Sequence, residues 1–449
     1  MIYYDDIQDA TPKLYNKKGS KNNPATVYSD NIYSFDIEVS NLFKINGVWQ
    51  NFDYSKPKEY YQSIPMMGLP YIWQFGINNQ VYYGRDLCEF TEVLEKISDE
   101  YVRKILWVHN LSYETEFLIQ LFKSKGWTIE KMLCRDLHKP ITYYIPEINI
   151  EFRCTYMLTN MSLAKAAEEF TDIAKKKTLD YDAKVRTPLT TLRPEEMEYC
   201  EYDILCVYEI VKTFMQRYKN HVAEIPYTST GEVRRRIREA LDYRHVLKMQ
   251  KLVPDAGNYM MLWSVFSGGY THANILASGH VQKNGHQQDI ASSYPEHLLS
   301  KLPSTPFMRC MKSDFNKEPD KFGYIAYVHF KGVRSKYYTT YMQTAKCIFD
   351  DDKEKRKDQM RHLTTDNGRV IMSKEHYMWV TNIDMDIINK VYNIDEIEVI
   401  KCYRSHLAYL DLRIIKLVLE LYGNKTKLKG VKGKEAVYKR DKSNLNSLY

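Results

Sequence analysis

The stretch Tyr33-Ser-Phe-Asp-Ile-Glu-Val39 decides the fold expected of this chain. Alternate residues of a strand point to opposite faces, so Asp36 and Glu38 share one face while apolar side chains fill the other. Two neighbouring acids on one strand face repel each other unless a cation lies between them. A solvated edge strand is the alternative interpretation, but the aromatic and aliphatic flanks favour a central strand. The stretch therefore predicts a buried strand that presents two carboxylates to a cation.

Two further segments carry polar side chains toward the same place. Residues 105–108 are predicted to form a strand that runs into a helix, so that Asn110 and Glu114 point into the groove at the strand end. A second helix is predicted to start at Pro194, which is followed by two glutamates in the first turn. On that helix Tyr199 and Asp203 are four residues apart and hence share a face.

These segments together supply a candidate metal site of four carboxylates, Asp36, Glu38, Glu114 and Asp203. Carboxylate and water ligands suit Mg²⁺ or Mn²⁺. Two such ions about 4 Å apart can activate a water and stabilise the leaving oxygen of a phosphodiester. Tyr199, one helical turn before Asp203, could orient that water. The arrangement predicts a 3′→5′ exonuclease.

The composition indicates a multidomain globular protein with a polyanionic partner. The chain has 449 residues, 44% of them hydrophobic, and a net charge of +7. That length predicts about two to four modules, and mild basicity suits a nucleic-acid partner. Eight cysteines without a C-x-x-C pair disfavour a zinc site and a disulfide framework. The N-terminus has no apolar signal segment and no apolar run approaches membrane-spanning length, so no membrane partner is expected.

Another acidic stretch is Asp289-Ile-Ala-Ser-Ser-Tyr-Pro295. An aspartate at the end of a predicted strand, beside a helix that starts at Tyr294-Pro295, could hold a divalent cation against a triphosphate. A cap or turn former is the alternative role for such an aspartate. Upstream, Phe266-Ser-Gly-Gly-Tyr270 contains paired glycines, which permit a close backbone approach to a ligand or simply form a tight turn.

Six motifs in this order resemble those of family B DNA polymerases, above all the protein-primed polymerases of bacteriophages. The matching segments are FDIE at 35–38, HNLSYE at 109–114, YCEYD at 199–203, FSGGY at 266–270, DIASSYP at 289–295 and KSNLNSLY at 442–449. The first three resemble the exonuclease motifs, and the fourth resembles the aromatic-x-Gly-Gly motif between the exonuclease and polymerase modules. The last two resemble polymerase motifs A and B, so the resemblance spans nearly the whole chain.

For the exonuclease, the resemblance implies metal ligands and residues that hold the DNA end. The metal ligands would be Asp36, Glu38, Glu114 and Asp203, and the residues that hold a frayed single-stranded 3′ end would be Asn110, Tyr113, Ser162 and Leu163. Tyr113 would stack on a base, and Lys176 resembles the family's auxiliary exonuclease lysine. Glu114 stands where the family usually has aspartate, and a small misplacement of a catalytic group can cost much rate.

For polymerisation, the resemblance implies that Asp289 binds metal ions and that Tyr294 lies under the incoming sugar and rejects a 2′-hydroxyl. Lys442 would contact the triphosphate, and Asn446 and Tyr449 would line the nucleotide pocket. Primer-template DNA and dNTPs are therefore the expected ligands. The DNA contacts between the modules would come from Phe266, Gly268 and Gly269.

The resemblance implies an α/β and α+β multidomain fold in the cytoplasm of an infected host. The expected parts are a lead-in segment (1–30), which we expect to be irregular, a ribonuclease-H-like 3′→5′ exonuclease domain (31–223), a partial palm with motif A (224–301), an insertion resembling terminal-protein region 1 (302–412) and truncated helical fingers with motif B (413–449). The insertion is placed by its position between the motifs.

Motif C, the D-T-D hairpin that supplies the second palm aspartate, is not found in the sequence, nor is the glycine that follows motif B. Nucleotide transfer needs both palm carboxylates to hold the cations. We therefore expect polymerisation to require a missing C-terminal part, either in a second polypeptide or beyond an interrupted reading frame. The alternatives are a free-standing Mg²⁺-dependent exonuclease on single-stranded DNA, and a non-catalytic module that binds DNA or a terminal priming protein.

Overall fold

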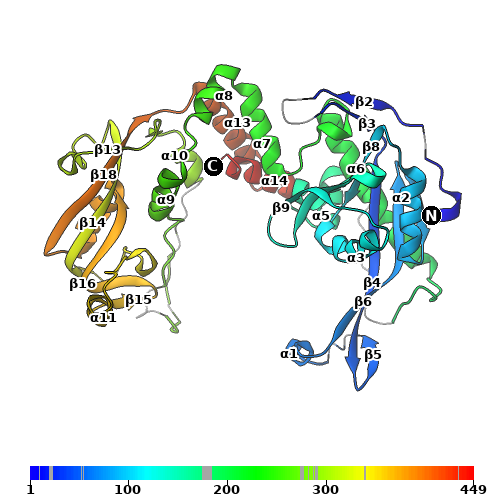
Figure 1. The fold of residues 1–449 in the computed structure, drawn as a ribbon, viewed down its shortest axis with the longest axis horizontal. Coiled ribbons are helices and arrows are strands. Elements are labelled where there is room, and N and C mark those ends of the chain that lie inside the picture. Colours follow the sequence, from blue (N-terminus) through cyan, green and yellow to red (C-terminus); the bar gives the residue numbers. More distant parts are fainter. Residues whose placement is uncertain are drawn as a thin grey trace. The chain divides into compact units, whose positions relative to one another are not determined.

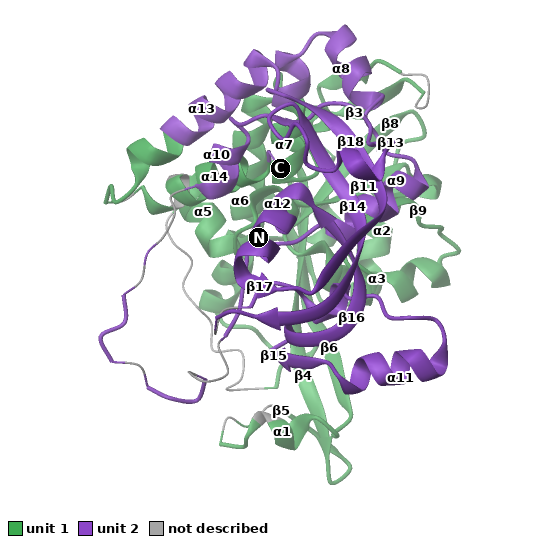
Figure 2. Ribbon diagram, turned by 90° about the vertical axis from the view of Figure 1, so that its left-hand side faces the viewer, with its two compact units in different colours: residues 1–235, 424–447 green, residues 236–423, 448–449 purple. Residues whose placement is uncertain are grey.

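The structure is a computed structural model that describes residues 1–9, 11–19, 24–51, 53, 55–173, 185–273, 278–281, 283–286, 288, 292–337, 340–432 and 434–448. The chain divides into two compact units (Figure 2). The first comprises Met1–Arg235 and Asn424–Ser447, and the second comprises Arg236–Gly423 and Leu448. Each unit has its own sheet, which confirms the expected α/β and α+β multidomain fold.

The first unit is built on a mixed sheet of eleven strands among the residues described. The strands run in the order β1 (Ile2–Tyr3), β7 (Gln80–Gly84), β6 (Met66–Ile77), β4 (Tyr33–Ile45), β8 (Val102–Val108), β11 (Ile150–Cys154), β10 (Pro140–Ile145) and β9 (Glu130–Cys134), and β2 (Leu14–Lys17), β3 (Thr26–Ser29) and β5 (Val48–Asn51) join beside this path. Strand β4 pairs with β8 in parallel and with β6 in antiparallel fashion. The predicted central position of this strand is therefore confirmed.

Helices cover both faces of this sheet. On one face, α2 (Leu87–Ile97) and α3 (Leu111–Ser124) pack on a core that includes Phe35, Phe90 and Leu118. On the other face, α5 (Leu163–Phe170) and α6 (Pro194–Arg217) pack on a core that includes Trp107 and Phe214. Short helices α1 (Lys58–Tyr61) and α4 (Thr155–Thr159) and the 3₁₀ turns Tyr4–Asp6, Pro146–Ile148 and Val222–Glu224 complete the sequence-contiguous part of this unit. Strands β4 and β6 extend beyond the rest of the sheet to β5 and α1 (Figure 1).

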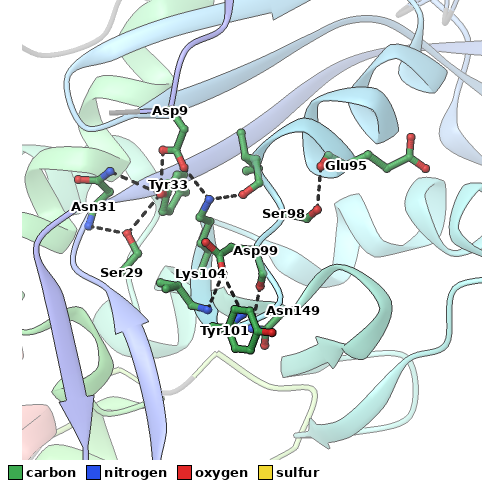
Figure 3. Close-up of polar contacts among 12 residues, drawn as sticks. Asp9, Ser29, Asn31, Tyr33, Glu95, Ser98, Asp99, Tyr101, Lys104 and Asn149 are labelled. Carbon is green, nitrogen blue, oxygen red and sulfur yellow. Dashed lines mark hydrogen bonds and ion pairs between the residues drawn. The ribbon is translucent and has the colours of Figure 1, made fainter. Parts of the chain in front are cut away.

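The expectation that the first thirty residues are irregular was wrong. Strands β1 and β3 pair with β7 and β8, and a polar network ties the segment to the sheet (Figure 3). In that network the Tyr33 hydroxyl donates a hydrogen bond to one carboxylate oxygen of Asp9 over 3.0 Å, and the Lys104 ammonium lies 2.5 Å from the other. Lys104 as a whole is only 5% exposed. Burying one member of such a pair without the other would cost several kcal/mol (about 3–5). The segment is therefore part of the domain.

The second unit contains an antiparallel sheet of seven described strands. Their order is β12 (Leu302–Pro303), β18 (Glu396–Ala408), β14 (Phe322–Ser335), β16 (Arg369–Thr381) and β15 (Thr364–Asp366), while β13 (Met308–Cys310) pairs with β18 and β17 (Tyr392–Asn393) pairs with β14. Helix α12 (Asn382–Val391) packs on this sheet and begins with a capping box between Thr381 and Asp384.

The remaining helices lie between residues 229 and 446. They are α7 (Ser229–Ala240), α8 (Tyr243–Gln250), α9 (Ala256–Val265), α10 (Ser293–His297), α11 (Lys353–Arg361), α13 (Leu412–Leu428) and α14 (Glu435–Asn446), with 3₁₀ turns at Lys312–Asp314 and Thr344–Lys346. Helix α14 packs against α5 within the first unit. Among the helices that the structure describes, none is both long and apolar enough to cross a bilayer.

Candidate metal centre and DNA-end site

The candidate metal centre begins with the close packing of α6 on the sheet. Ser34 on β4 lies opposite Gly76 on β6. A Cβ added to Gly76 would lie 2.6 Å from Ile204 Cγ2 of α6 and would also clash with the Ser34 hydroxyl. Only glycine permits this approach, so the position of α6 over β4 depends on Gly76.

Three acids converge where α6 crosses β4. Asp36 and Glu38 come from β4 and Asp203 comes from α6, and one carboxylate oxygen of each lies within 4.8 Å of the others. Glu38 is 7% exposed and Asp203 is 2% exposed. Three hard oxygen donors at this spacing fit Mg²⁺ or Mn²⁺, whereas the absence of sulfur and nitrogen from the set disfavours Zn²⁺. The donor set therefore fits a divalent cation.

Glu114, the fourth predicted ligand, lies in the first turn of α3 and is 4% exposed. It is not one of the three clustered acids, but burial and the charges of Asp36 and Glu38 raise its pKa well above the usual range. Its Oε2 atom is buried without a hydrogen-bond partner. A cation near these acids would relieve the repulsion and offer that oxygen a partner. The role of Glu114 as a ligand stays a prediction.

The structure also reveals a polar residue at this site that the sequence analysis missed. Gln74 on β6 lies directly opposite Asp36, so the two side chains share the face covered by α6. The Gln74 side chain is fully buried, and neither its Nε2 nor its Oε1 has a hydrogen-bond partner. An unpaired buried amide costs about 1–3 kcal/mol. The same amide beside a cation could bond to a water in the coordination shell.

Two tyrosines lie near the acids. Tyr199 is half-buried on α6, one turn before Asp203, and packs beside Tyr71 and Cys200. Tyr113 on α3 is 39% exposed, and its ring contacts Phe117 edge-on at 5.3 Å between centroids. Burial, then the charge of Glu114, raises the pKa of Tyr113 to about 12. Tyr113 therefore keeps its proton and exposes part of its ring.

Three of the four residues expected to hold a DNA end line one cavity in the first unit, and Tyr113 is not among its lining residues. Asn110, Ser162 and Leu163 line a cavity of about 500 Å³ together with Tyr156 and two basic residues, Arg135 and Lys139. Asn110 precedes α3 and accepts a hydrogen bond from Ser112, while Ser162 precedes α5. His109 borders the same cavity, and its Nδ1 pairs with the Thr155 hydroxyl at 3.0 Å, as expected of a packed histidine. The two cations were not predicted from the sequence.

The residues expected at a polymerase site are only partly within the described chain. Lys176, Asp289 and Tyr449 lie outside the described residues. Tyr294 is 54% exposed on α10 in the second unit, whereas Lys442 and Asn446 are exposed on α14, which belongs to the first unit. Their common role in nucleotide binding stays a prediction.

The Phe266–Tyr270 segment follows α9 in the second unit. The Phe266 side chain is 66% exposed, and the Lys346 ammonium donates to its carbonyl over 2.5 Å and to the Ser267 hydroxyl over 2.9 Å. A Cβ on Gly268 would meet no atom within 4 Å, and one on Gly269 would meet only the Tyr294 hydroxyl, at 3.8 Å. The glycines are therefore not required by packing among the described residues, which leaves their DNA-binding role a prediction.

Comparisons with known proteins identify a family and solved structures with a similar fold. Residues 183–449 match the sequence model of the family described as DNA polymerase type B, organellar and viral. The structure of phi29 DNA polymerase with primer-template DNA and incoming nucleotides superposes with a TM-score of 0.66 at 16% identity, covering 93% of this chain and 67% of that chain. The phi29 complex with single-stranded DNA gives a TM-score of 0.62 at 16% identity and the same coverage. No curated protein matches the sequence significantly.

Proposed function

Because this chain belongs to the organellar and viral family of type B DNA polymerases, we propose that its first unit is a 3′→5′ exonuclease acting on single-stranded 3′ ends of DNA. The observation that carries the proposal is the cluster of Asp36, Glu38 and Asp203, whose oxygens lie within 4.8 Å of one another. The phi29 enzyme shares the fold and has been solved with single-stranded DNA, which supports this class of substrate.

The three acids would hold one or two Mg²⁺ or Mn²⁺ ions, and a bound cation would supply Lewis-acid activation of water and of the scissile phosphate. The pKa of Glu114 is raised by burial and by the neighbouring carboxylates, and a bound cation would lower it so that Glu114 ionises. Tyr199 would donate a hydrogen bond from its hydroxyl to the attacking water and so orient it. Asp36 and Glu38 would keep their positions because β4 is buried in the centre of the sheet.

The DNA end would enter the cavity lined by Asn110, Ser162 and Leu163. Arg135 and Lys139 at the same cavity would contact backbone phosphates, since phosphate contacts supply most of the affinity for nucleic acid. Tyr113 would stack its exposed ring on a base. Base stacking tolerates any sequence, which suits a proofreading exonuclease.

For nucleotide addition, we propose that Asp289 acts as one palm carboxylate, with Tyr294, Lys442, Asn446 and Tyr449 binding the dNTP. The 449 residues contain no D-T-D motif for the second carboxylate. Polymerisation is therefore proposed only for this chain together with a segment or polypeptide that supplies it. Priming by a terminal protein, bound through the residues that resemble terminal-protein region 1, belongs to the same proposal.

The test is digestion of a 5′-labelled single-stranded oligonucleotide, with Asp203→Asn as the site variant and Glu116→Gln, an exposed acid on α3, as the matched control. We expect Mg²⁺-dependent shortening from the 3′ end by the wild-type and control proteins. Asp203→Asn should lower the rate at least about a hundredfold, as loss of alignment at a reacting centre does. A folded wild-type protein that binds the oligonucleotide and leaves it intact would instead support the non-catalytic DNA-binding module.

A further inference from the structure

A second cavity in the first unit lies on the sheet face that also carries α5 and α6. It has a volume of about 310 Å³ and crosses the neighbouring strands β3, β8, β11, β10 and β9. Tyr28, Arg103, Glu151 and Tyr144, each from a different strand, line it. It shares no lining residue with the cavity proposed for the DNA end. The cavity is therefore a separate site.

The cavity carries an excess of positive charge. Lys17, Lys18, Arg103 and Lys131 line it, and within the described chain none of these four has a carboxylate within 4.0 Å. The lining carboxylate, Glu151, is already bonded to the buried Arg153 at 2.7 Å. Clustered cations without anionic partners repel one another, so the site favours an anionic ligand.

The pKa values of two lining residues are shifted, one mainly by burial and the other by neighbouring positive charge. Burial, followed by the charge of Arg153, lowers the pKa of the Lys17 ammonium. Although burial opposes it, the charges of Arg153 and Arg103 lower the pKa of Glu151. The Glu151 shift has the sign that a positive potential produces, because such a potential disfavours a bound proton.

Aromatic rings lie next to the basic side chains of this cavity. The Arg103 guanidinium lies 3.9 Å from the centroid of the Tyr144 ring, and the Lys131 ammonium lies 5.3 Å from the same ring. The Tyr227 ring is 40% exposed, and its face is occupied in part by Arg153 at 4.7 Å. Cations beside partly exposed rings are the elements of a single-strand binding groove, where phosphates meet the cations and bases stack on the rings.

We propose that this basic tyrosine cavity, formed by the lining residues Lys17, Lys18, Arg103, Lys131, Tyr144 and Tyr227, binds single-stranded DNA at a second position on the first unit. The polymer is inferred from the proposed function, while the site itself follows from charge and cavity. An unpaired strand is required because the bases of a duplex are stacked on each other and cannot meet the tyrosine rings. The segment expected to be an irregular lead-in contributes Lys17 and Lys18.

The experiment measures fluorescence anisotropy of a labelled 30-nucleotide single strand in EDTA, where no cleavage occurs. Lys131→Gln should weaken binding about fivefold at 0.1 M salt and reduce the slope of log K against log salt by about 0.7, the value for one lost phosphate contact on a single strand. Tyr227→Leu should weaken binding about tenfold with no change in that slope. The matched control is Lys123→Gln, an exposed lysine on α3, which should bind as the wild type does.

Two further arms identify the ligand and separate this site from the nuclease. Unlabelled single strand should compete better than duplex DNA or polyglutamate, and cleavage of a trinucleotide in Mg²⁺ should be the same in Lys131→Gln and wild type. Unchanged binding by both cavity variants would overturn the proposal, as would polyglutamate competing best, which would identify an acidic protein as the ligand. Because binding is read without cleavage, an inactive nuclease would refute only the proposed function.

Discussion

Gly76 on β6 and Ile204 on α6 are packed so closely that a Cβ on Gly76 would lie 2.6 Å from Ile204 Cγ2. Asp203 is the residue before Ile204, and Asp36 lies two residues beyond Ser34, the partner of Gly76 on β4. The spacing of the acidic cluster therefore depends on the absence of a side chain at Gly76.

We predict that Gly76→Ala destabilises the first unit by about 1–3 kcal/mol, the usual cost of overpacking. By displacing α6 it should also lower nuclease activity by on the order of a hundredfold at a temperature where the variant is folded. Urea unfolding and the oligonucleotide assay measure the two effects. Gly423→Ala on α13, where a Cβ would meet no atom within 4 Å, is the control and should not lower activity. Equal activity in Gly76→Ala would show that the cluster does not depend on this contact.

Divalent cations should stabilise the first unit, because the bound state relieves repulsion among Asp36, Glu38 and Asp203. At a hundred times its Kd, Mg²⁺ or Mn²⁺ should add about 2.7 kcal/mol to the free energy of unfolding. Chelation with EDTA should reverse the gain. In Asp36→Asn the cation effect should disappear, and the cation-free protein should be at least as stable as wild type. An undiminished cation effect in Asp36→Asn would place the bound ion elsewhere.

Gln74→Met should separate stability from cation binding. Removing a buried amide without partners should raise the free energy of unfolding in EDTA by about 1–3 kcal/mol. If the amide bonds to a water of the coordination shell, the same change should weaken Mn²⁺ binding about 10–100-fold, as loss of an outer-shell partner does. Isothermal titration measures that affinity, with Gln120→Met, an exposed glutamine on α3, as the control. Wild-type Mn²⁺ affinity in Gln74→Met would contradict the role.

The second unit should lose stability in mild acid through His376. Burial, with a smaller effect of His329, lowers the pKa of His376 from 6.5 to about 4. The unfolded chain therefore binds a proton that the folded unit excludes, so stability is complete above about pH 6.5 and falls as the pH drops toward 4. The loss between pH 7 and 5 should be about 2 kcal/mol.

Hydrogen exchange of the β14 and β16 amides measures this loss of stability in the second unit alone. His376→Gln, which cannot be protonated, should flatten the dependence between pH 7 and 5, where few carboxylates titrate. The same pH dependence in wild type and His376→Gln would assign the effect to another group.

Elements with strong local signals could be predicted from the sequence. The alternation at Tyr33–Val39 identified a central strand, which pairs with β6 and β8. Helix α6 begins at Pro194, as its proline and first-turn glutamates indicate. The three clustered acids were predicted because their types and order resemble a known motif set, and that family is confirmed.

The features that were missed depend on contacts between distant residues. The first thirty residues are polar, and their attachment through Asp9 to Lys104 and Tyr33 has no local signal. Gln74 is a single amide within an apolar strand, and its role can be inferred only from its pairing with Asp36 across the sheet. The basic tyrosine cavity likewise depends on the pairing of β3 with β8 and of β8 with β11, which are neighbours in the sheet but not in the chain.

The most direct test of the shared cation site is Mn²⁺ anomalous diffraction from crystals of the wild-type protein. We predict an anomalous peak about 2.2 Å from oxygens of Asp36, Glu38 and Asp203, the usual range for an oxygen-bound ion of this size. That peak should be lost in Asp203→Asn. Crystals in saturating Mn²⁺ that show no peak among these three carboxylates would rule out a shared cation site.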